Sequence, residues 1–161
     1  MIALQIQDIK SFMSKLLLQD TFDSFLLKEA EITVAVTHTI DGTLHPDFFD
    51  ETDFSDPLIR WGDIRQHCFS IIKGKRTPLH FTFVFRLGSD NTTRLLSQNG
   101  LSLLPEQVSG LYLNCRFDGT RLLCTSGIAL TFFTMDKALE HVWDELLQKF
   151  FRQNEIPYTF A

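Results

Sequence analysis

The stretch from residue 135 to residue 153 constrains the fold most, because its apolar residues recur at the spacing of a helix with one buried face. Thr134 is placed to cap the start of this helix, and Pro157 prevents its continuation. At 1.5 Å per residue, the helix would be roughly 28 Å long. Because bulky aromatic rings form part of its stripe, we expect the helix to lie on an antiparallel sheet. The stripe consists of Met135, Leu139, Val142, Trp143, Leu146, Leu147, Phe150 and Phe151.

The rest of the chain supplies strands for such a sheet. The clearest runs from Leu79 to Leu87, where every second residue is apolar. Further strands are expected at 2–6, 29–40, 44–49, 111–117, 120–125 and 128–133. Helices are expected after Asp8, after Thr21 and over 63–73, with a single helical turn near Leu95 in the long connection from Gly88 to Gly110. This order predicts an α+β fold in which a curved antiparallel sheet packs against the long C-terminal helix. The order of elements resembles the helix-grip arrangement, in which a bent antiparallel sheet wraps around a long C-terminal helix. The helix at 63–73 has no counterpart in that arrangement.

Length and composition set further bounds. One domain, residues 1–161, is expected for a chain of this length, and 44 % hydrophobic residues with 16 Phe indicate a globular protein. Three Cys, an odd number without metal-ligand spacing, indicate reduced thiols and a cytoplasmic location. No apolar run approaches the length of a membrane span, so no membrane partner is expected. The net charge of −5 disfavours a general nucleic-acid binder but permits a local basic site.

Two groups of residues could bind metal or react as thiols. His38, His45 and Asp47 would share a face if Asp41-Gly42 formed a two-residue turn, but a three-residue loop matches the apolar faces better and separates the histidines. We therefore predict no metal site. Cys115 and Cys124 would lie diagonally across a two-residue turn at Asp118-Gly119, as buried thiols too far apart for a disulfide.

The most distinctive polar segment runs from Lys73 to Pro78. It is not a phosphate-binding Walker loop, because Phe69 and Arg76 stand where glycine and Ser or Thr are required. A helix end with Gly74 just beyond it accounts for Lys73, Gly74 and Pro78. Lys75 and Arg76 remain unexplained, and we read them as either solvated surface or an anion-binding group. The candidate anion-binding residues are Lys73, Lys75 and Arg76.

The aromatic faces of the helix and the sheet permit two interpretations. They could form a filled core, or they could enclose a pocket for a small apolar ligand. Periodicity cannot separate the two, because both place the same residues on the same faces. The pocket would be lined by Phe81, Phe83, Phe85, Trp143, Leu147 and Phe150.

Five motifs extend along nearly the whole chain. They are Phe22-Asp23-Ser24-Phe25-Leu26-Leu27, Ile72-Lys73-Gly74-Lys75-Arg76-Thr77-Pro78, Leu113-Asn114-Cys115, Cys124-Thr125-Ser126-Gly127, and Asp136-Lys137 leading to Trp143-Asp144-Glu145. Together they resemble an uncharacterised bacterial family, a domain of unknown function found mainly in Gram-positive species. The resemblance implies a small bacterial cytoplasmic protein, and it carries no activity, cofactor or site residues.

The sequence favours one function over two others. A non-enzymatic binding protein that contacts an anionic partner through residues 73–76 comes first, and a binder of a small apolar ligand comes second. An enzyme of unidentified class is third, because no nucleophile elbow, dinucleotide glycine pattern or zinc-protease helix is present. No cofactor is expected, and the oligomeric state is not readable from these patterns.

Overall fold

A computed structural model describes residues 1–50 and 54–161. Within these residues, eight strands form one antiparallel sheet in the order β3-β2-β5-β6-β7-β1-β8, with β4 paired to β2. The strands are β1 (Ala3–Ile6), β2 (Phe25–Thr33), β3 (Thr37–Asp41), β4 (Ile59–Arg60), β5 (His80–Leu87), β6 (Val108–Phe117), β7 (Leu122–Leu130) and β8 (Tyr158–Phe160). The α-helices are α1 (Ile9–Leu17), α2 (Trp61–Ile72), α3 (Ser89–Gln98) and α4 (Ala138–Gln153), with 3-10 turns η1 (Pro46–Phe48) and η2 (Pro105–Gln107).

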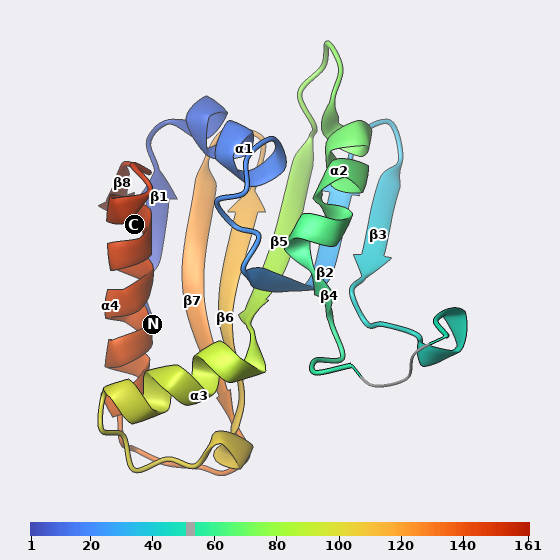
Figure 1. Ribbon diagram of the computed structural model, residues 1–161. Helices are drawn as coiled ribbons and strands as arrows, with labels where there is room; N and C mark the ends of the chain where they lie inside the picture. Colours follow the sequence, from blue (N-terminus) through green and yellow to red (C-terminus); the bar gives the residue numbers. More distant parts are fainter. Residues whose placement is uncertain (51–53) are drawn as a thin grey trace.

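The α-helices lie on one face of the sheet (Figure 1). Alternation along β5 shows why: Phe81, Phe83 and Phe85 point toward the helices and are at most 2 % exposed, whereas Thr82 and Val84 on the other face remain partly exposed. A single layer of helices therefore covers the apolar face, and the opposite face stays in contact with solvent. The α+β class and the antiparallel sheet packed against a C-terminal helix are confirmed.

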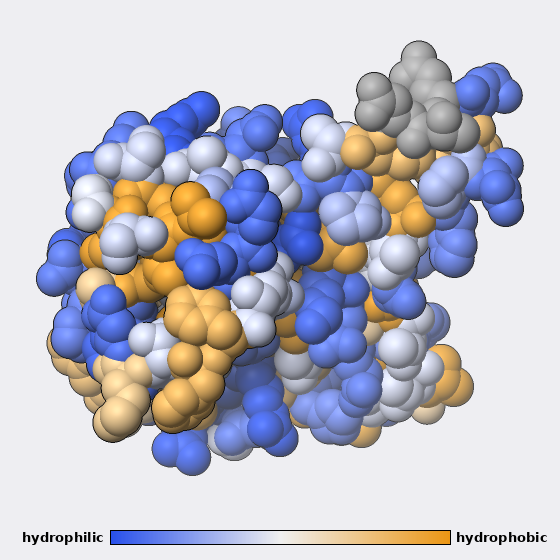
Figure 2. All heavy atoms as spheres, turned by 90° about the horizontal axis from the view of Figure 1, so that it is seen from below, coloured by the Kyte–Doolittle hydropathy of each residue, from blue (hydrophilic) through white to orange (hydrophobic). Residues whose placement is uncertain are grey.

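Helix α4 lies on the sheet as predicted, but it begins later than its apolar stripe. Leu139, Trp143, Leu147 and Phe151 are buried, and the Trp143 indole Nε1 donates a hydrogen bond to the Tyr112 carbonyl at 2.9 Å. Met135 is 83 % exposed and precedes the helix, so assigning it to the stripe was wrong. Leu104, Phe132 and Phe133 are exposed as well, and Figure 2 shows apolar side chains gathered on the surface of the molecule seen from below.

Several strand and helix predictions in the first half were wrong. Residues 21–24 form turns instead of a helix, and the expected strand at 29–40 divides into β2 and β3 around Val34, whose N–H bonds to the Val36 carbonyl. The expected strand at 44–49 contains η1. Gly42 does not open a hairpin there but directly follows β3, and its N–H donates to the carbonyl of Lys28 in β2 at 2.9 Å.

Two predictions in the second half also need correction. The segment after Gly88 forms the ten-residue helix α3, where only a single helical turn was expected. The two strands predicted around Gly127 are the single strand β7, because Gly127 pairs with Tyr112 without interrupting the ladder. The helix predicted at 63–73 is confirmed as α2, although it begins at Trp61 and has no side-chain cap at its start.

Candidate functional site

The candidate metal ligands do not gather. His38 lies on the edge strand β3 and pairs with Ile32 of β2, because the hairpin turns at residues 34–36 and not at the predicted loop near Asp41-Gly42. His45 follows β3 in a separate loop. Across residues 1–50 and 54–161, no three His, Cys, Asp or Glu side chains form a group that could hold a metal ion.

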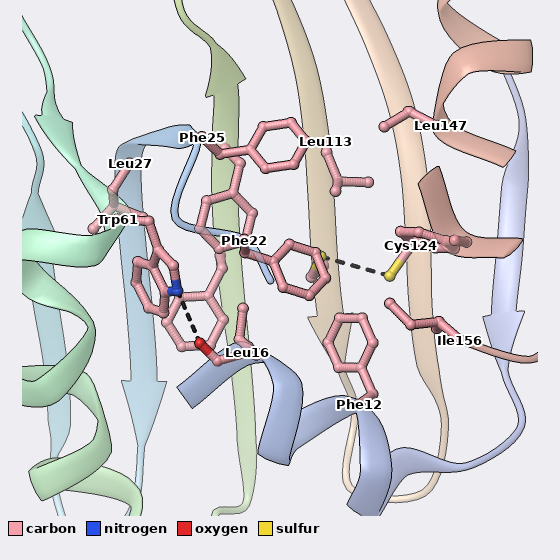
Figure 3. Close-up of a cluster of buried hydrophobic side chains, with 14 of the residues drawn as sticks. Phe12, Leu16, Phe22, Phe25, Leu27, Trp61, Leu113, Cys124, Leu147 and Ile156 are labelled. Atoms are coloured by element: carbon pink, nitrogen blue, oxygen red, sulfur yellow. Dashed lines mark hydrogen bonds between the residues drawn. The ribbon is translucent and has the colours of Figure 1, made fainter. Parts of the chain in front are cut away.

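All three thiols are buried, as predicted for Cys115 and Cys124, but these two lie closer together than predicted. Cys115 and Cys124 face each other directly across β6 and β7, with their sulfur atoms 3.5 Å apart (Figure 3). The diagonal placement was wrong because the loop has four residues, 118–121, instead of two. Burial raises the pKa of Cys124 well above its usual value and raises that of Cys68 to about 12, so neither thiol is an activated nucleophile.

The Asp118 side chain explains the longer loop. Its carboxylate oxygen accepts hydrogen bonds from the backbone N–H groups of Thr120 and Arg121 at 2.9 and 2.8 Å. The Asp118 N–H in turn donates to the Arg121 carbonyl. These bonds close a four-residue loop and move the register by two residues, which brings the cysteines opposite each other.

The six predicted pocket residues lie in different parts of the core. Phe83 and Phe85 contact Trp61 of α2, with ring centroids 5.3 and 5.1 Å apart, whereas Phe150 of α4 contacts Phe22 and Phe25 at 5.4 and 5.5 Å. Rings contributed by residues 22, 25 and 61 therefore fill much of the space over the sheet, as Figure 3 shows. Trp143 and Leu147 are at most 1 % exposed. Sequence reasoning missed Trp61, because the expected helix began two residues after it.

The basic segment connects the end of α2 to the start of β5. The Lys73 N–H donates to the Phe69 carbonyl, and Gly74 has a φ of 147°, a conformation that favours glycine. The Leu79 N–H donates to the Thr33 carbonyl at 2.9 Å, which attaches the far end of the segment to β2. In the described part of the chain, Lys73, Lys75 and Arg76 are exposed, and their side chains form no ion pair or hydrogen bond.

A groove of about 830 Å³ lies beside this segment. It runs between α1 and the end of α2, over the ends of β5 and β6, at the upper end of the molecule in Figure 1. We call it the basic groove, because Lys10 of α1 joins the three cations of the segment and its described lining contains no acidic residue. Its apolar lining is formed by Ile9, Met13, Leu17, Leu18, Phe69, Ile72, Pro78, Phe81 and Phe117.

Part of this apolar lining remains open to solvent. Leu17, Phe81 and Phe117 form a buried floor, but Met13 and Phe69 are only partly buried, and Leu18 is 58 % exposed. The sequence identified the cations but not the groove, because its walls come from α1, α2 and the β5–β6 pair, which are distant in sequence. Of the six predicted pocket residues, Phe81 lines the groove.

Other motif residues hold the fold together. Arg65 of α2 donates two hydrogen bonds to the Asp23 carboxylate, at 3.0 and 2.9 Å. The Ser126 hydroxyl donates to the buried Asp144 carboxylate and accepts from the Ile2 N–H at 2.9 Å. Arg86 pairs with Asp56 at 2.6 Å, so these two partly buried charges neutralise each other.

The architecture and the groove define a class of protein: an α+β protein with one layer of helices on an antiparallel sheet and a basic-rimmed apolar groove. Residues 15–159 match a family of unknown function (DUF5721), and the chain belongs to that family, which confirms the resemblance. No curated protein and no solved structure matches the chain. Among the described residues, no helix combines the length and apolarity needed to cross a bilayer.

Proposed function

We propose that this chain is a non-enzymatic binding protein that contacts an anionic partner through Lys73, Lys75 and Arg76. The supporting observation is the basic groove, where these three cations and Lys10 surround a lining without acidic residues. The whole chain carries a net charge of −5, so this concentration of positive charge is local. Like charges around one groove add to the potential that an anion meets there, and salt screens this potential over a Debye length of roughly 8 Å at physiological ionic strength.

The chemistry of the rim suits a carboxylate or a phosphate. Arg76 offers a planar fork of donors that can contact two oxygens at once, and the lysines act as mobile point charges. The described groove lining contains two hydroxyls, those of Ser14 and Thr77, but no His, Asp or Glu that could act on them as a general base. This composition supports binding over catalysis. Three free thiols are consistent with action in a reducing cytoplasm, in line with the bacterial origin that the resemblance implies.

Titration with inorganic tripolyphosphate at low salt tests this proposal. A double variant, Lys75→Gln with Arg76→Gln, removes two charges from exposed positions and should weaken binding about twofold to thirtyfold, since exposed ion pairs contribute roughly 0.2–1 kcal/mol each. The matched control is Lys149→Gln with Arg116→Gln, which removes the same charges from other exposed positions. Equal affinity in both double variants would contradict the proposal.

The second candidate function is binding of a small apolar ligand. The structure favours the basic groove for this ligand over the space under α4. The residues expected to line a pocket under α4 are mostly buried against other rings. The partly exposed apolar surface lies instead in the basic groove, around Met13 and Phe69. An apolar ligand and an anionic partner would therefore occupy the same groove.

A further inference from the structure

The basic groove combines apolar lining residues with positively charged ones. Its floor is built from buried apolar side chains, its cations stand at the rim, and no acidic residue lies among its described lining residues. A purely polar anion would leave the partly exposed Met13, Leu18 and Phe69 in water. A purely apolar ligand would leave the cations without a counter-charge. We propose that the ligand is an amphipathic anion, a single acyl chain ending in a carboxylate or phosphate; this inference rests on the proposed function.

The apolar wall formed by α1 is elongated. Ile9, Met13 and Leu17 are four residues apart, so they follow one side of the helix over a distance of roughly 12 Å. On α2, Phe69 and Ile72 are three residues apart and share a side in the same way. A flexible chain can lie along such a surface and contact each residue in turn, whereas a compact ring contacts fewer of them.

The rim places the charged group at the end of α2. Lys73, Lys75 and Arg76 follow Ile72 directly, so the last apolar residue of α2 adjoins the first cation of the segment. Lys10 lies next to Ile9 at the start of α1. A ligand with its chain along α1 and α2 would therefore have cations within reach of its head group. The groove volume of about 830 Å³ falls within the range of roughly 300–1,000 Å³ found for ligand pockets.

Ser14 provides a variant that separates chain binding from anion binding. It lines the groove between the apolar residues of α1 and is partly exposed, so Ser14→Phe would fill the groove without removing a core contact. The matched control is Ser11→Phe on the same helix, at a position outside the groove lining. Circular dichroism and thermal melting of both variants would establish that they fold.

The experiment titrates the full chain with hexanoate, octanoate and decanoate below their micelle-forming concentrations, monitored by calorimetry. Affinity should rise by up to about fourfold for each added methylene that leaves water. Decanol and decyltrimethylammonium, which keep the chain but lack the negative charge, should bind at least tenfold more weakly than decanoate. Ser14→Phe should abolish the dependence on chain length, and Ser11→Phe should retain it.

The failure of this inference can be distinguished from the failure of the proposed function. If tripolyphosphate binds through Lys75 and Arg76 while decanoate binds no better than hexanoate, the anionic partner stands and the acyl chain is overturned. If neither ligand responds to the Lys75→Gln, Arg76→Gln variant, both are overturned. A third arm uses vesicles of anionic phospholipid. Binding to vesicles without binding to monomeric decanoate would overturn the free acyl ligand in favour of a membrane surface.

Discussion

The Trp61 indole Nε1 donates a hydrogen bond to the main-chain carbonyl of Leu16 at 2.9 Å, in the buried interior (Figure 3). This bond ties the first residue of α2 to the last turn of α1, the two helices that flank the basic groove. The same ring packs edge-on against Phe83 and Phe85 of β5. One side chain therefore fixes both helices relative to the sheet.

Trp61→Phe should destabilise the protein by about 2–4 kcal/mol, because it leaves a buried carbonyl without its donor and a space beside two aromatic rings. Urea denaturation followed by circular dichroism measures the change. Leu16→Met is a suitable control, since it alters the side chain but keeps the carbonyl. A loss below about 0.5 kcal/mol for Trp61→Phe would show that the hydrogen bond and the packing of this ring contribute little.

Ser126→Ala should destabilise the protein by about 1–3 kcal/mol. The substitution removes the hydroxyl that donates to the buried Asp144 carboxylate and accepts from the Ile2 N–H, so two polar groups lose a partner. Chemical denaturation gives the free energy of unfolding. Ser109→Ala, at an exposed position on β6, should change it by less than about 0.5 kcal/mol. Equal effects at the two positions would contradict this role.

Gly42→Ala should unfold the protein or cost more than about 3 kcal/mol. A Cβ atom at this position would lie 1.8 Å from the Leu27 carbonyl oxygen, so the backbone contact between residue 42 and β2 would have to separate. Gly127→Ala is the matched control, because its Cβ would meet its nearest neighbour, Tyr112, at 3.7 Å, an ordinary contact. Thermal melting of both variants measures the loss of stability. A stable Gly42→Ala protein would show that the backbone can move to relieve the contact between residue 42 and the Leu27 carbonyl.

The loop at Asp118 should give a measurable acid dependence. Hydrogen bonds from the backbone N–H groups of Arg121 and Thr120 lower the pKa of Asp118 to about 2 from its usual 3.8. Because the folded pKa is the lower one, the stabilisation is present above pH 3.8 and is lost as the pH falls through about 2.

Asp118→Asn keeps an accepting oxygen but removes this titration. The melting-temperature difference between wild type and Asp118→Asn should therefore shrink between pH 4 and pH 2. Asp20→Asn, at an exposed position in another loop, controls for the loss of one charge. A constant difference for Asp118→Asn across this window would mean that the carboxylate gains nothing from its hydrogen bonds.

The sequence predicted those elements whose signal is local. The alternation in β5 and the stripe of α4 were read correctly, because one buried face imposes a fixed period on each. The start of α4 was missed because an exposed Met135 happens to fit the same period. The turn at residues 34–36 was missed because Val34, Ala35 and Val36 carry no Gly, Pro, Asn or Asp signal.

The site was predicted only in part, for a different reason. The cations at 73–76 are consecutive in the sequence, so they were found, and their use as a ligand site stays a prediction. The groove depends on α1, α2 and the β5–β6 pair meeting at one end of the sheet, which no local pattern encodes. Similarly, the Cys115–Cys124 pairing depends on a loop length that a single Asp side chain sets.

The basic segment is attached to the rest of the molecule at its two ends, through the Lys73 and Leu79 amides. Between these anchor points, Gly74, Lys75, Arg76 and Thr77 are all exposed. Side chains here can be exchanged without disturbing the interior, whereas any alteration of the floor reaches Phe81 and Phe117 in the core. Stability therefore constrains the shape of the basic groove but not the charge of its rim, so selection on Lys75 and Arg76 would have to act through what they bind.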